Sequence, residues 1–346
     1  MRAMVLRDWW NLEVQQLPDP APGPGEVLVE IAATGICGSD LHGYTGENGR
    51  RRPGQVMGHE TAGHVRAVGP GVTGLAPGRE VTVNPVLACG HCDRCAAGQE
   101  QSCPTKSVIG VTPSIVSAFA ELMLAPAANV VPLPSGVPVE LGALVEPLAV
   151  GYHALRRGAC GAGDRVLVLG GGPIGQACVL AAQRLGADGV VVTEPMEHRR
   201  ALVEDLGATV ADPAAADGAG LAAAVADALG GPPTIAVDAV GLSVTLATAL
   251  AATPPGSTVV LVGMGSPDLA LAAYDVSVAE RTVVGSFCYT AQEFRETAAW
   301  IGATTAPLDR LVERRVGLDG GPDAFAALAR GEDQSSKVLV CPKGAA

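Results

Sequence analysis

The sequence has little positive charge. Its 346 residues include 23 lysines and arginines against 35 aspartates and glutamates, which gives a formal net charge of −12 at neutral pH. Lysine itself is scarce and occurs only as Lys106, Lys337 and Lys343. A surface with this balance repels phosphate backbones and anionic lipid headgroups over roughly a Debye length. Nucleic acid and membrane surfaces are therefore not expected as partners.

The sequence also lacks a long uninterrupted apolar segment. The nearest candidate for a membrane span, residues 166–182, contains four glycines and a proline and is followed by Arg184. This composition favours a strand, a tight turn and a helix instead. The apolar run at residues 3–6 is flanked by Arg2 and Arg7 and is too short for the core of a signal peptide. We therefore expect a cytoplasmic protein with no membrane segment.

Charged residues are few, at 17%, whereas hydrophobic residues make up 48% of the sequence. This is the opposite of the composition that keeps a chain disordered. The length suggests about two domains with cores large enough to be stable without disulfides. The nine cysteines cannot all pair within the chain because their number is odd, and a reducing compartment disfavours structural disulfides. Metal binding or catalysis is the expected use of the cysteines.

The first part of the sequence carries signals of short strands. Apolar, β-branched runs at residues 27–31, 65–68 and 80–83 are separated by clusters of glycine and proline. This pattern indicates a β-rich, loop-rich region that extends to about residue 131.

The pattern changes from residue 165 onward. Apolar runs at 166–169 and 189–193 flank a segment with helical spacing at 174–185. Strands that are buried on both faces lose their polar alternation, so this pattern predicts a βαβ unit in a parallel sheet. Further strands are expected at 208–210, 235–237, 259–262, 282–284 and 337–340, and further helices at 214–229 and 294–301.

The strongest local motif is a cluster of four cysteines, Cys89, Cys92, Cys95 and Cys103, with the spacing C-x2-C-x2-C-x7-C. Four thiolates close a tetrahedral shell around Zn²⁺ and leave no open position, so such a site serves structure rather than catalysis. Four unrelated thiols would rarely produce two consecutive x2 spacings beside glycines. An iron–sulfur cluster also uses four thiolates and remains a minor alternative.

A second group of metal-ligand residue types is dispersed along the sequence and consists of Cys37, His59, Glu60 and Glu146. Taken singly, each has a simpler explanation, such as a small core residue, a hydrogen-bonded turn residue or a solvated charge. Together they offer one thiolate, one imidazole and a choice of carboxylates. This combination suits a zinc site that leaves a position for water or substrate.

A third motif is a glycine-rich turn, G-x-G-x-x-G, between a predicted strand and a predicted helix. Its glycines are Gly170, Gly172 and Gly175, and Glu194 ends the next predicted strand. The glycines permit a tight turn and a close approach of a pyrophosphate to the helix N-terminus, and the acidic residue can accept hydrogen bonds from a ribose. The order of strand, glycines, helix, strand and acid predicts a dinucleotide-binding domain.

Together these motifs resemble the zinc-dependent medium-chain dehydrogenases/reductases, of the alcohol and polyol dehydrogenase kind, over essentially the whole length. Besides the cysteine cluster and the glycine turn, the resemblance rests on a zinc signature formed by Gly58, His59, Glu60, Gly63, Gly69 and Val72. It implies an α/β protein with a GroES-like, β-rich catalytic domain over residues 1–146, which includes a structural zinc lobe at 86–106. A Rossmann domain with a doubly wound parallel sheet is expected over 147–286, and residues 287–346 return to the catalytic domain.

The resemblance implies two zinc ions per chain, one structural and one catalytic. The catalytic ion would be held by Cys37 and His59, with Glu60 and Glu146 as the candidate carboxylates. Relatives differ in which carboxylate binds, and some exchange the two during turnover, so the sequence does not choose between them. Such an ion acts as a Lewis acid on an alcohol that transfers hydride to a nicotinamide.

The resemblance also implies roles for three residues of the first site. Ser39 and His42 occupy the positions of a proton relay that leads to solvent. Asp40 either orients His59, because a ligating imidazole usually donates its other N–H to a carboxylate or carbonyl, or caps its own loop.

We expect NAD rather than NADP as the cofactor. Glu194 would repel a ribose 2′-phosphate, although Arg199 and Arg200 lie close enough in sequence to soften that repulsion. The expected cofactor-binding residues are Gly170, Gly172, Ile174, Gly175, Glu194, Arg199, Val262, Gly263, Met264, Phe287 and Cys288.

The sequence departs from the sorbitol-type enzymes at two substrate positions. Gly43 stands where a tyrosine follows the relay histidine, and Cys288 stands where an arginine precedes a tyrosine that is retained as Tyr289. We therefore expect a secondary alcohol, diol or polyol-like substrate, with small alcohols favoured over long sugar alcohols. We also expect a homo-oligomer, either a dimer or a tetramer.

Two other functions are compatible with parts of this pattern. A zinc-free, quinone-reductase-like enzyme would lack both Cys37 and the cysteine cluster, so the sequence argues against it. A non-catalytic dinucleotide- or zinc-binding protein of the same fold remains the alternative.

Overall fold

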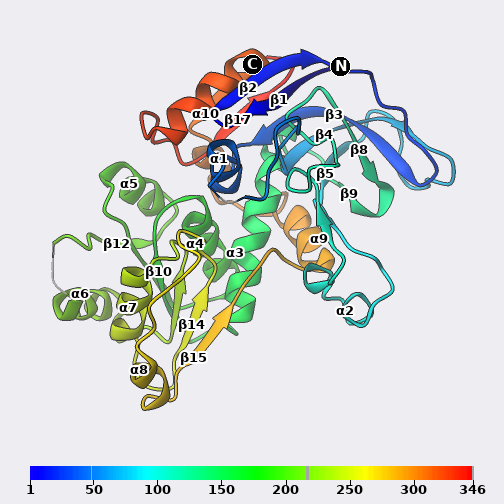
Figure 1. Cartoon of the computed structure of the whole chain (residues 1–346). Coiled ribbons are helices and arrows are strands. Elements are labelled where there is room, and N and C mark those ends of the chain that lie inside the picture. Colours follow the sequence, from blue (N-terminus) through cyan, green and yellow to red (C-terminus); the bar gives the residue numbers. More distant parts are fainter. Residues whose placement is uncertain (48, 216–217, 345–346) are drawn as a thin grey trace. The chain divides into compact units, whose positions relative to one another are not determined.

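The computed structural model describes residues 1–47, 49–215 and 218–344. The chain forms two compact units, one made of Met1–Glu146 together with Thr290–Ala346 and the other of Pro147–Tyr289. Both ends of the chain belong to the first unit (Figure 1). The chain returns to the first unit at Thr290, whereas the sequence places this return at residue 287.

Most strands of the first unit form a seven-stranded sheet, in which β16 and β17 are parallel and the other neighbours are antiparallel. In sheet order these strands are β16 (Arg314–Gly317), β17 (Val338–Cys341), β3 (Glu26–Gly35), β4 (Glu60–Val68), β5 (Glu80–Val83) and β9 (Val130–Pro132), and β8 (Leu122–Pro126) pairs with β3. Two smaller antiparallel sheets are formed by β1 (Arg2–Asp8) with β2 (Asn11–Gln16) and by β6 (Val86–Leu87) with β7 (Ser107–Val108).

The pairing of β3 with β4 requires glycine at two positions. A Cβ on Gly63 would lie 2.0 Å from the carbonyl oxygen of Glu30, so only glycine permits the two backbones to approach this closely. The same register places Gly35 opposite Glu60. A Cβ on Gly35 would lie 2.1 Å from Glu60 Oε2, so the absence of a side chain there leaves room for the buried carboxylate.

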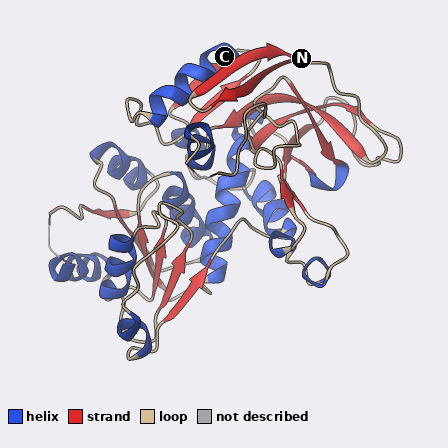
Figure 2. Cartoon of the chain, viewed as in Figure 1, coloured by secondary structure: helices blue, strands red, loops and turns tan. Residues whose placement is uncertain are grey.

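Helices of the first unit are short and follow or precede its strands along the chain (Figure 2). They are α1 (Gly38–Thr45), α2 (Asp93–Ala96), α9 (Ala291–Trp300), α10 (Gly321–Ala329) and the 3₁₀ helices η1 (Glu100–Ser102), η2 (Ala127–Asn129), η3 (Val139–Leu144), η4 (Leu308–Leu311) and η5 (Leu318–Gly320). Helix α3 (Val145–Arg157) begins in the first unit and continues into the second. Within the described ranges, no helix is both long enough and apolar enough to cross a bilayer.

The second unit contains a six-stranded parallel sheet with the strand order β12-β11-β10-β13-β14-β15. Its strands are β10 (Arg165–Leu169), β11 (Gly189–Thr193), β12 (Thr209–Ala211), β13 (Ile235–Asp238), β14 (Thr258–Leu261) and β15 (Thr282–Gly285). Its helices are α4 (Pro173–Leu185), α5 (Glu197–Asp205), α6 (Gly218–Leu229), α7 (Ser243–Ala252) and α8 (Ala273–Ser277). Helices α6 and α7 lie on one side of this sheet and α4 on the other (Figure 1). This is the Rossmann strand order, which confirms the expected α/β fold class.

Local sequence explains the ends of α4. Gly172 is the N-cap, Pro173 occupies the first turn, where its missing N–H costs nothing, and Gly186 ends the helix in the left-handed conformation with φ of 82°.

Helix α6 begins later than its apolar spacing predicts. We expected a helix over 214–229, but Ala214 and Ala215 lie in a turn before the helix, and residues 216–217 are outside the described residues. The turn forms because the backbone N–H of Ala214 donates to Asp212 Oδ1 at 2.8 Å.

Candidate functional site

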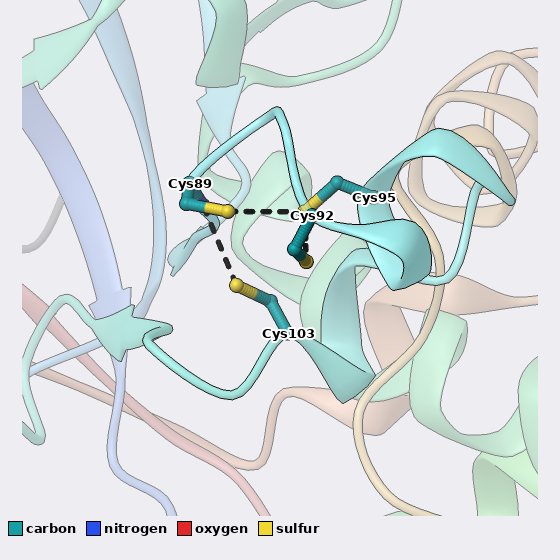
Figure 3. A group of neighbouring side chains, drawn as sticks. All are labelled: Cys89, Cys92, Cys95 and Cys103. Carbon is teal, nitrogen blue, oxygen red and sulfur yellow. Dashed lines mark hydrogen bonds between the residues drawn. The ribbon is translucent and has the colours of Figure 1, made fainter.

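The four cysteines of the lobe converge on one point. Cys89 follows β6, Cys92 is the N-cap of α2, Cys95 lies within α2 and Cys103 ends η1. Their sulfur atoms all lie within 4.8 Å of one another, and Figure 3 shows the four side chains directed toward a common centre. The Sγ atoms of Cys89 and Cys95 are 3.9 Å apart and those of Cys92 and Cys95 are 3.5 Å apart. Zinc–sulfur bonds of about 2.3 Å in a tetrahedron place sulfur atoms about 3.8 Å apart, so the set fits zinc.

The ionisation of these thiols also favours a cation. The backbone N–H of Cys89 donates to Cys103 Sγ at 3.5 Å and lowers the pKa of Cys103 to about 6. Burial raises the pKa of Cys95 to about 12. Four thiols at this spacing cannot all ionise next to one another unless a bound cation compensates their charge.

The cysteine lobe is tied to the segment that returns to the first unit. Glu100 in η1 accepts a hydrogen bond from the backbone N–H of Ala291 through its Oε2 at 3.2 Å. Ala291 is the first residue of α9, where Glu293 Oε2 also accepts the N–H of Thr290 at 2.9 Å. The lobe therefore supplies one of the two carboxylates that satisfy the N-terminus of α9.

The structure also brings Cys37, His59 and Glu60 together. Cys37 is the N-cap of α1, His59 directly precedes β4, and Glu60 is the first residue of β4. Their ligand atoms all lie within 4.8 Å of one another, and His59 and Glu60 are buried. One sulfur, one imidazole nitrogen and one carboxylate oxygen form a donor set that fits zinc with a further position free for exchange.

Lys337 is a site residue that the sequence analysis does not identify. Its Nζ donates to Glu60 Oε2 at 2.5 Å and to the carbonyl oxygen of Ile36 at 3.3 Å. Burial alone would lower the pKa of Lys337, but the charges of Glu60, Cys37 and Glu146 outweigh burial and raise it. In the sequence, Lys337 is distinguished only as one of three lysines, because the other Lys+Arg residues are arginines.

Glu146 lies near this cluster without joining it. It is buried in the first turn of α3, and its charge acts on Lys337. Among the described residues, the group within 4.8 Å contains Glu60 and not Glu146.

Asp40 connects the two ligand-bearing segments. Its fully buried carboxylate lies 3.4 Å from His59 Nδ1 through Oδ1, and its Oδ2 accepts the backbone N–H of Cys37 at 3.3 Å. Asp40 thus lies beside the His59 imidazole and also accepts a backbone hydrogen bond at the start of its own helix. Burial alone would raise the pKa of Asp40, but His59 and Arg51 together lower it to about 2. In turn Asp40 and Cys37 outweigh burial and raise the pKa of His59 well above its usual range.

Ser39 and His42 lie three residues apart on α1, a spacing that places side chains next to one another on a helix. Ser39 is half-buried, whereas His42 is exposed. His42 Nδ1 lies 2.9 Å from Glu47 Oε2. A carboxylate at this nitrogen selects the tautomer with Nδ1–H, which leaves Nε2 as the basic nitrogen.

The glycine-rich turn joins β10 to α4. Gly170 adopts φ of 95°, and a Cβ on Gly175 would lie 1.8 Å from the carbonyl oxygen of Gly170, so both positions need glycine. Gly172 is the N-cap of α4 and Ile174 lies in its first turn. The N-terminus of α4 therefore opens at the carboxyl end of a parallel strand, as an anion site requires.

Glu194 follows β11, and its carboxylate accepts a hydrogen bond from the glycine-rich turn. Its Oε2 accepts the N–H of Gly171 and its Oε1 accepts the N–H of Met196, both at 2.8 Å, and the residue is only 3% exposed. Arg199 Nη1 lies 3.9 Å from the position of a Cβ on Gly172. Arg200 instead donates to the carbonyl oxygens of Glu194 and Pro195.

The remaining expected cofactor residues follow two other strands. Val262, Gly263 and Met264 come after β14, and Phe287 and Cys288 come soon after β15. Because the strands are parallel, these residues lie at the same sheet edge as the glycine-rich turn. Met264 and Phe287 are exposed there.

The two tyrosines near the substrate positions are both buried. Tyr44 packs between Trp10 and Phe325, and its hydroxyl donates to the carbonyl oxygen of Trp10 at 2.8 Å. Tyr289 is fully buried in the second unit. Tyr44 therefore belongs to the core and does not replace the side chain absent at Gly43.

Comparison with known proteins agrees with this geometry. Residues 23–135 match the alcohol dehydrogenase GroES-like domain, and residues 173–303 match the zinc-binding dehydrogenase domain. The L-threonine 3-dehydrogenase of Xanthomonas campestris pv. campestris (strain B100) is 40% identical over 214 residues, which are 60% of this chain. The matched part spans 62% of that relative's length, less than two thirds.

Solved structures cover the whole chain. A protein described as a zinc-binding dehydrogenase from Sinorhizobium meliloti 1021, bound to NADP, has a TM-score of 0.90 and 32% identity over 99% of both chains. The 2R,3R-butanediol dehydrogenase of Bacillus subtilis has a TM-score of 0.88 and 29% identity, again over 99% of both chains. With its two clusters of candidate metal ligands and its glycine-rich turn, the chain belongs to the zinc-dependent medium-chain dehydrogenase family.

Proposed function

We propose that the protein is a zinc-dependent oxidoreductase that transfers a hydride between a secondary alcohol, diol or polyol-like substrate and NAD. The observation that carries the proposal is the convergence of Cys37, His59 and Glu60 in a chain that also carries a Rossmann glycine-rich turn. The relatives named for threonine and for butanediol support the substrate class, because both compounds carry a secondary hydroxyl group.

Two zinc ions would have separate sites in this protein. Cys89, Cys92, Cys95 and Cys103 would hold the structural ion. Cys37 and His59, with Glu60 or Glu146, would hold the catalytic ion. When bound, the catalytic ion supplies Lewis-acid polarisation of the substrate oxygen.

The protein's own residues provide the route for the proton released on oxidation. Ser39 is half-buried and lies one helical turn from His42, which is exposed. Ser39 passes the proton to the basic Nε2 of His42, and His42 releases it to solvent. Glu47 contributes by holding Nδ1–H, so that Nε2 stays free to accept the proton.

The preference for NAD rests on Glu194. A carboxylate at the end of β11 repels a ribose 2′-phosphate. Arg199 acts in the opposite direction, because its guanidinium lies beside the glycine-rich turn. Arg200 contributes little to this balance, since it is held by two backbone carbonyls and lies 3.3 Å from Asp212.

The preference for a small substrate rests on positions 43 and 288. Gly43 is buried and offers no hydroxyl group. Cys288 cannot donate the pair of charged hydrogen bonds that the guanidinium group of an arginine would donate. A long sugar alcohol would therefore leave hydroxyl groups without partners on leaving water, whereas a small secondary alcohol or vicinal diol would not.

We propose that two copies of the chain associate through the edge of the six-stranded sheet. Strand β15 is an edge strand, and its Thr282 and Gly285 are exposed. Nearby, Tyr274 and Val278 are 84% and 83% exposed although both are apolar. An unpaired edge next to exposed apolar side chains favours a second copy of the chain as the partner.

The decisive experiment follows NAD reduction with a panel of secondary alcohols and vicinal diols. We expect turnover that is lost after removal of metal by a chelator and restored by added zinc. A preparation that carries both metals and binds NAD, yet oxidises no alcohol in the panel, would instead indicate a non-catalytic binding protein of the same fold.

A further inference from the structure

Arg51 is a fully buried arginine that no step of the proposed mechanism uses. It lies in the loop between α1 and β4 and is among the largest fully buried side chains of the described residues. A buried guanidinium is costly unless a carboxylate and hydrogen bonds compensate its charge. The contacts of Arg51 must therefore compensate the charge of its buried guanidinium.

The guanidinium of Arg51 contacts Asp40. Its Nη2 donates to Asp40 Oδ1 at 2.9 Å, and the two side chains are 1% and 0% exposed. The same Oδ1 lies 3.4 Å from His59 Nδ1, while Oδ2 receives the N–H of Cys37. A single carboxylate thus links Arg51 to both non-carboxylate residues of the candidate metal cluster.

The aliphatic part of Arg51 depends on Gly43. A Cβ on Gly43 would lie 2.3 Å from Arg51 Cγ and 3.3 Å from its Cβ and Cδ. Arg51 therefore fills the space into which a side chain at position 43 would project. The buried position of the Arg51 stem therefore requires a residue without a side chain at position 43.

We infer that Arg51 is a positioning residue of the catalytic metal site, which holds Asp40 in place and balances its charge so that His59 and the start of α1 keep their ligand geometry. The inference rests on the proposed function in one respect, that Cys37 and His59 bind the metal. Without Arg51, the buried Asp40 would be drawn toward His59 and the Cys37 backbone, its remaining partners.

The test measures metal binding rather than turnover. The variants are Arg51→Met, which keeps much of the aliphatic volume, and Arg51→Lys, which keeps the charge. Arg7→Met is the control, since Arg7 pairs with Glu13 at 3.7 Å within the separate two-stranded sheet of β1 and β2 in the same unit. Zinc affinity of the catalytic site is measured by competition with a chelator, and its geometry by the visible spectrum after Co²⁺ substitution.

We expect Arg51→Met to weaken catalytic zinc about 10- to 100-fold and to change the cobalt spectrum, while the lobe zinc and the control variant stay unchanged. Arg51→Lys should recover part of the affinity. Gly43→Ala should weaken zinc in the same direction without altering any charge, because it displaces the stem of Arg51. Wild-type affinity and an unchanged spectrum in Arg51→Met, with only a lower melting temperature, would overturn the inference.

Two further measurements cover the cases in which Arg51→Met does not fold or the wild-type protein does not bind metal through Cys37. If Arg51→Met does not fold, Arg51→Met combined with Asp40→Asn removes both charges, which buried pairs tolerate better than the loss of one partner. That double variant should fold and still show weakened zinc, and normal zinc affinity in it would overturn the inference. If wild-type protein shows no cobalt–sulfur band that depends on Cys37, the proposed function fails, whereas an unchanged band in Arg51→Met counts against the inference alone.

Discussion

At the scale of single residues, the candidate metal cluster depends on the absence of a side chain at Gly35, next to Glu60. Gly35 faces Glu60 across β3 and β4, and the Lys337 ammonium donates to Oε2, the same carboxylate oxygen that a Cβ on Gly35 would meet. The position of the carboxylate therefore depends both on a strand residue that must lack a side chain and on a buried ammonium. These two constraints fix the carboxylate without using a metal.

Gly35→Ala should disrupt this arrangement, because the new Cβ would lie 2.1 Å from Glu60 Oε2. We expect at least a roughly tenfold loss of catalytic zinc affinity or of kcat/KM, with little change in the lobe zinc. Metal analysis and steady-state kinetics would check this. Gly161→Ala is the control, since a Cβ there meets no atom within 4 Å. Equal behaviour of the two variants would contradict the prediction.

His42 leads to a prediction about pH. His42→Ala should slow alcohol oxidation at neutral pH by roughly 10²-fold, and high pH or added imidazole buffer should restore part of the rate, because bulk base then replaces the side chain. Glu47→Gln should have a smaller effect in the same direction, since it removes the carboxylate at Nδ1. The pH profile of kcat measures both. An unchanged profile in His42→Ala would show that the proton leaves by another route.

At the scale of elements, we expect the turn between β10 and α4 and the end of β11 to determine the choice of cofactor together. Glu194→Ala leaves the N–H groups of Gly171 and Met196 without their carboxylate, so rates with both cofactors should fall. The fall should be larger with NAD, which shifts the ratio of kcat/KM toward NADP. Arg199→Ala should instead reduce activity with NADP while sparing NAD. A wild-type preference for NADP would refute the assignment of NAD.

The two metal clusters should respond differently to loss of a ligand. Cys95→Ser should remove one zinc and lower the melting temperature, because a closed site contributes its binding energy to folding and the lobe also holds α9 through Glu100. Cys37→Ala should remove the other zinc and abolish turnover while leaving the melting temperature nearly unchanged. Metal analysis and thermal melts would measure this. A fully active preparation with one zinc per chain would contradict it.

Elements of the second unit are predictable from the sequence, and several of the first are not. All six parallel strands lie within one residue of their expected ends. The four inner strands are largely buried, and burial on both faces produces continuous apolar runs. Helix α1 is missed because it opens with Gly38, Ser39 and Asp40, residue types of low helix propensity. Its stability comes from contacts of Asp40 with residues outside the helix.

Sequence reasoning finds the candidate ligands and Asp40, but it does not find Lys337 or Arg51. Cysteine and histidine are few, and their spacing carries chemical meaning, so Cys37 and His59 can be proposed from the sequence. Lys337 and Arg51 have no such spacing. The partner of Lys337 is 277 positions away, and only the pairing of β17 with β3 brings the two together.

At the scale of the whole molecule, the open edge at β15 predicts association. We expect a dimer or tetramer in sedimentation experiments, and Tyr274→Asp combined with Val278→Asp should produce a smaller species by placing charge on this surface. Val116→Asp, at another exposed apolar position in the first unit, is the control. A monomeric wild-type protein, or an unchanged size in the double variant, would contradict the proposed interface.

The pairing of Lys337 with Glu60 has a consequence for biosynthesis. Glu60 leaves the ribosome 277 residues before its partner, and the whole parallel-sheet unit is translated in between. At about 5–20 residues per second the delay is roughly 14–55 s. During that interval β17 is not yet available to β3, and Glu60 has no ammonium beside it. A nascent chain can therefore complete its parallel-sheet unit before the candidate metal cluster reaches the arrangement described above.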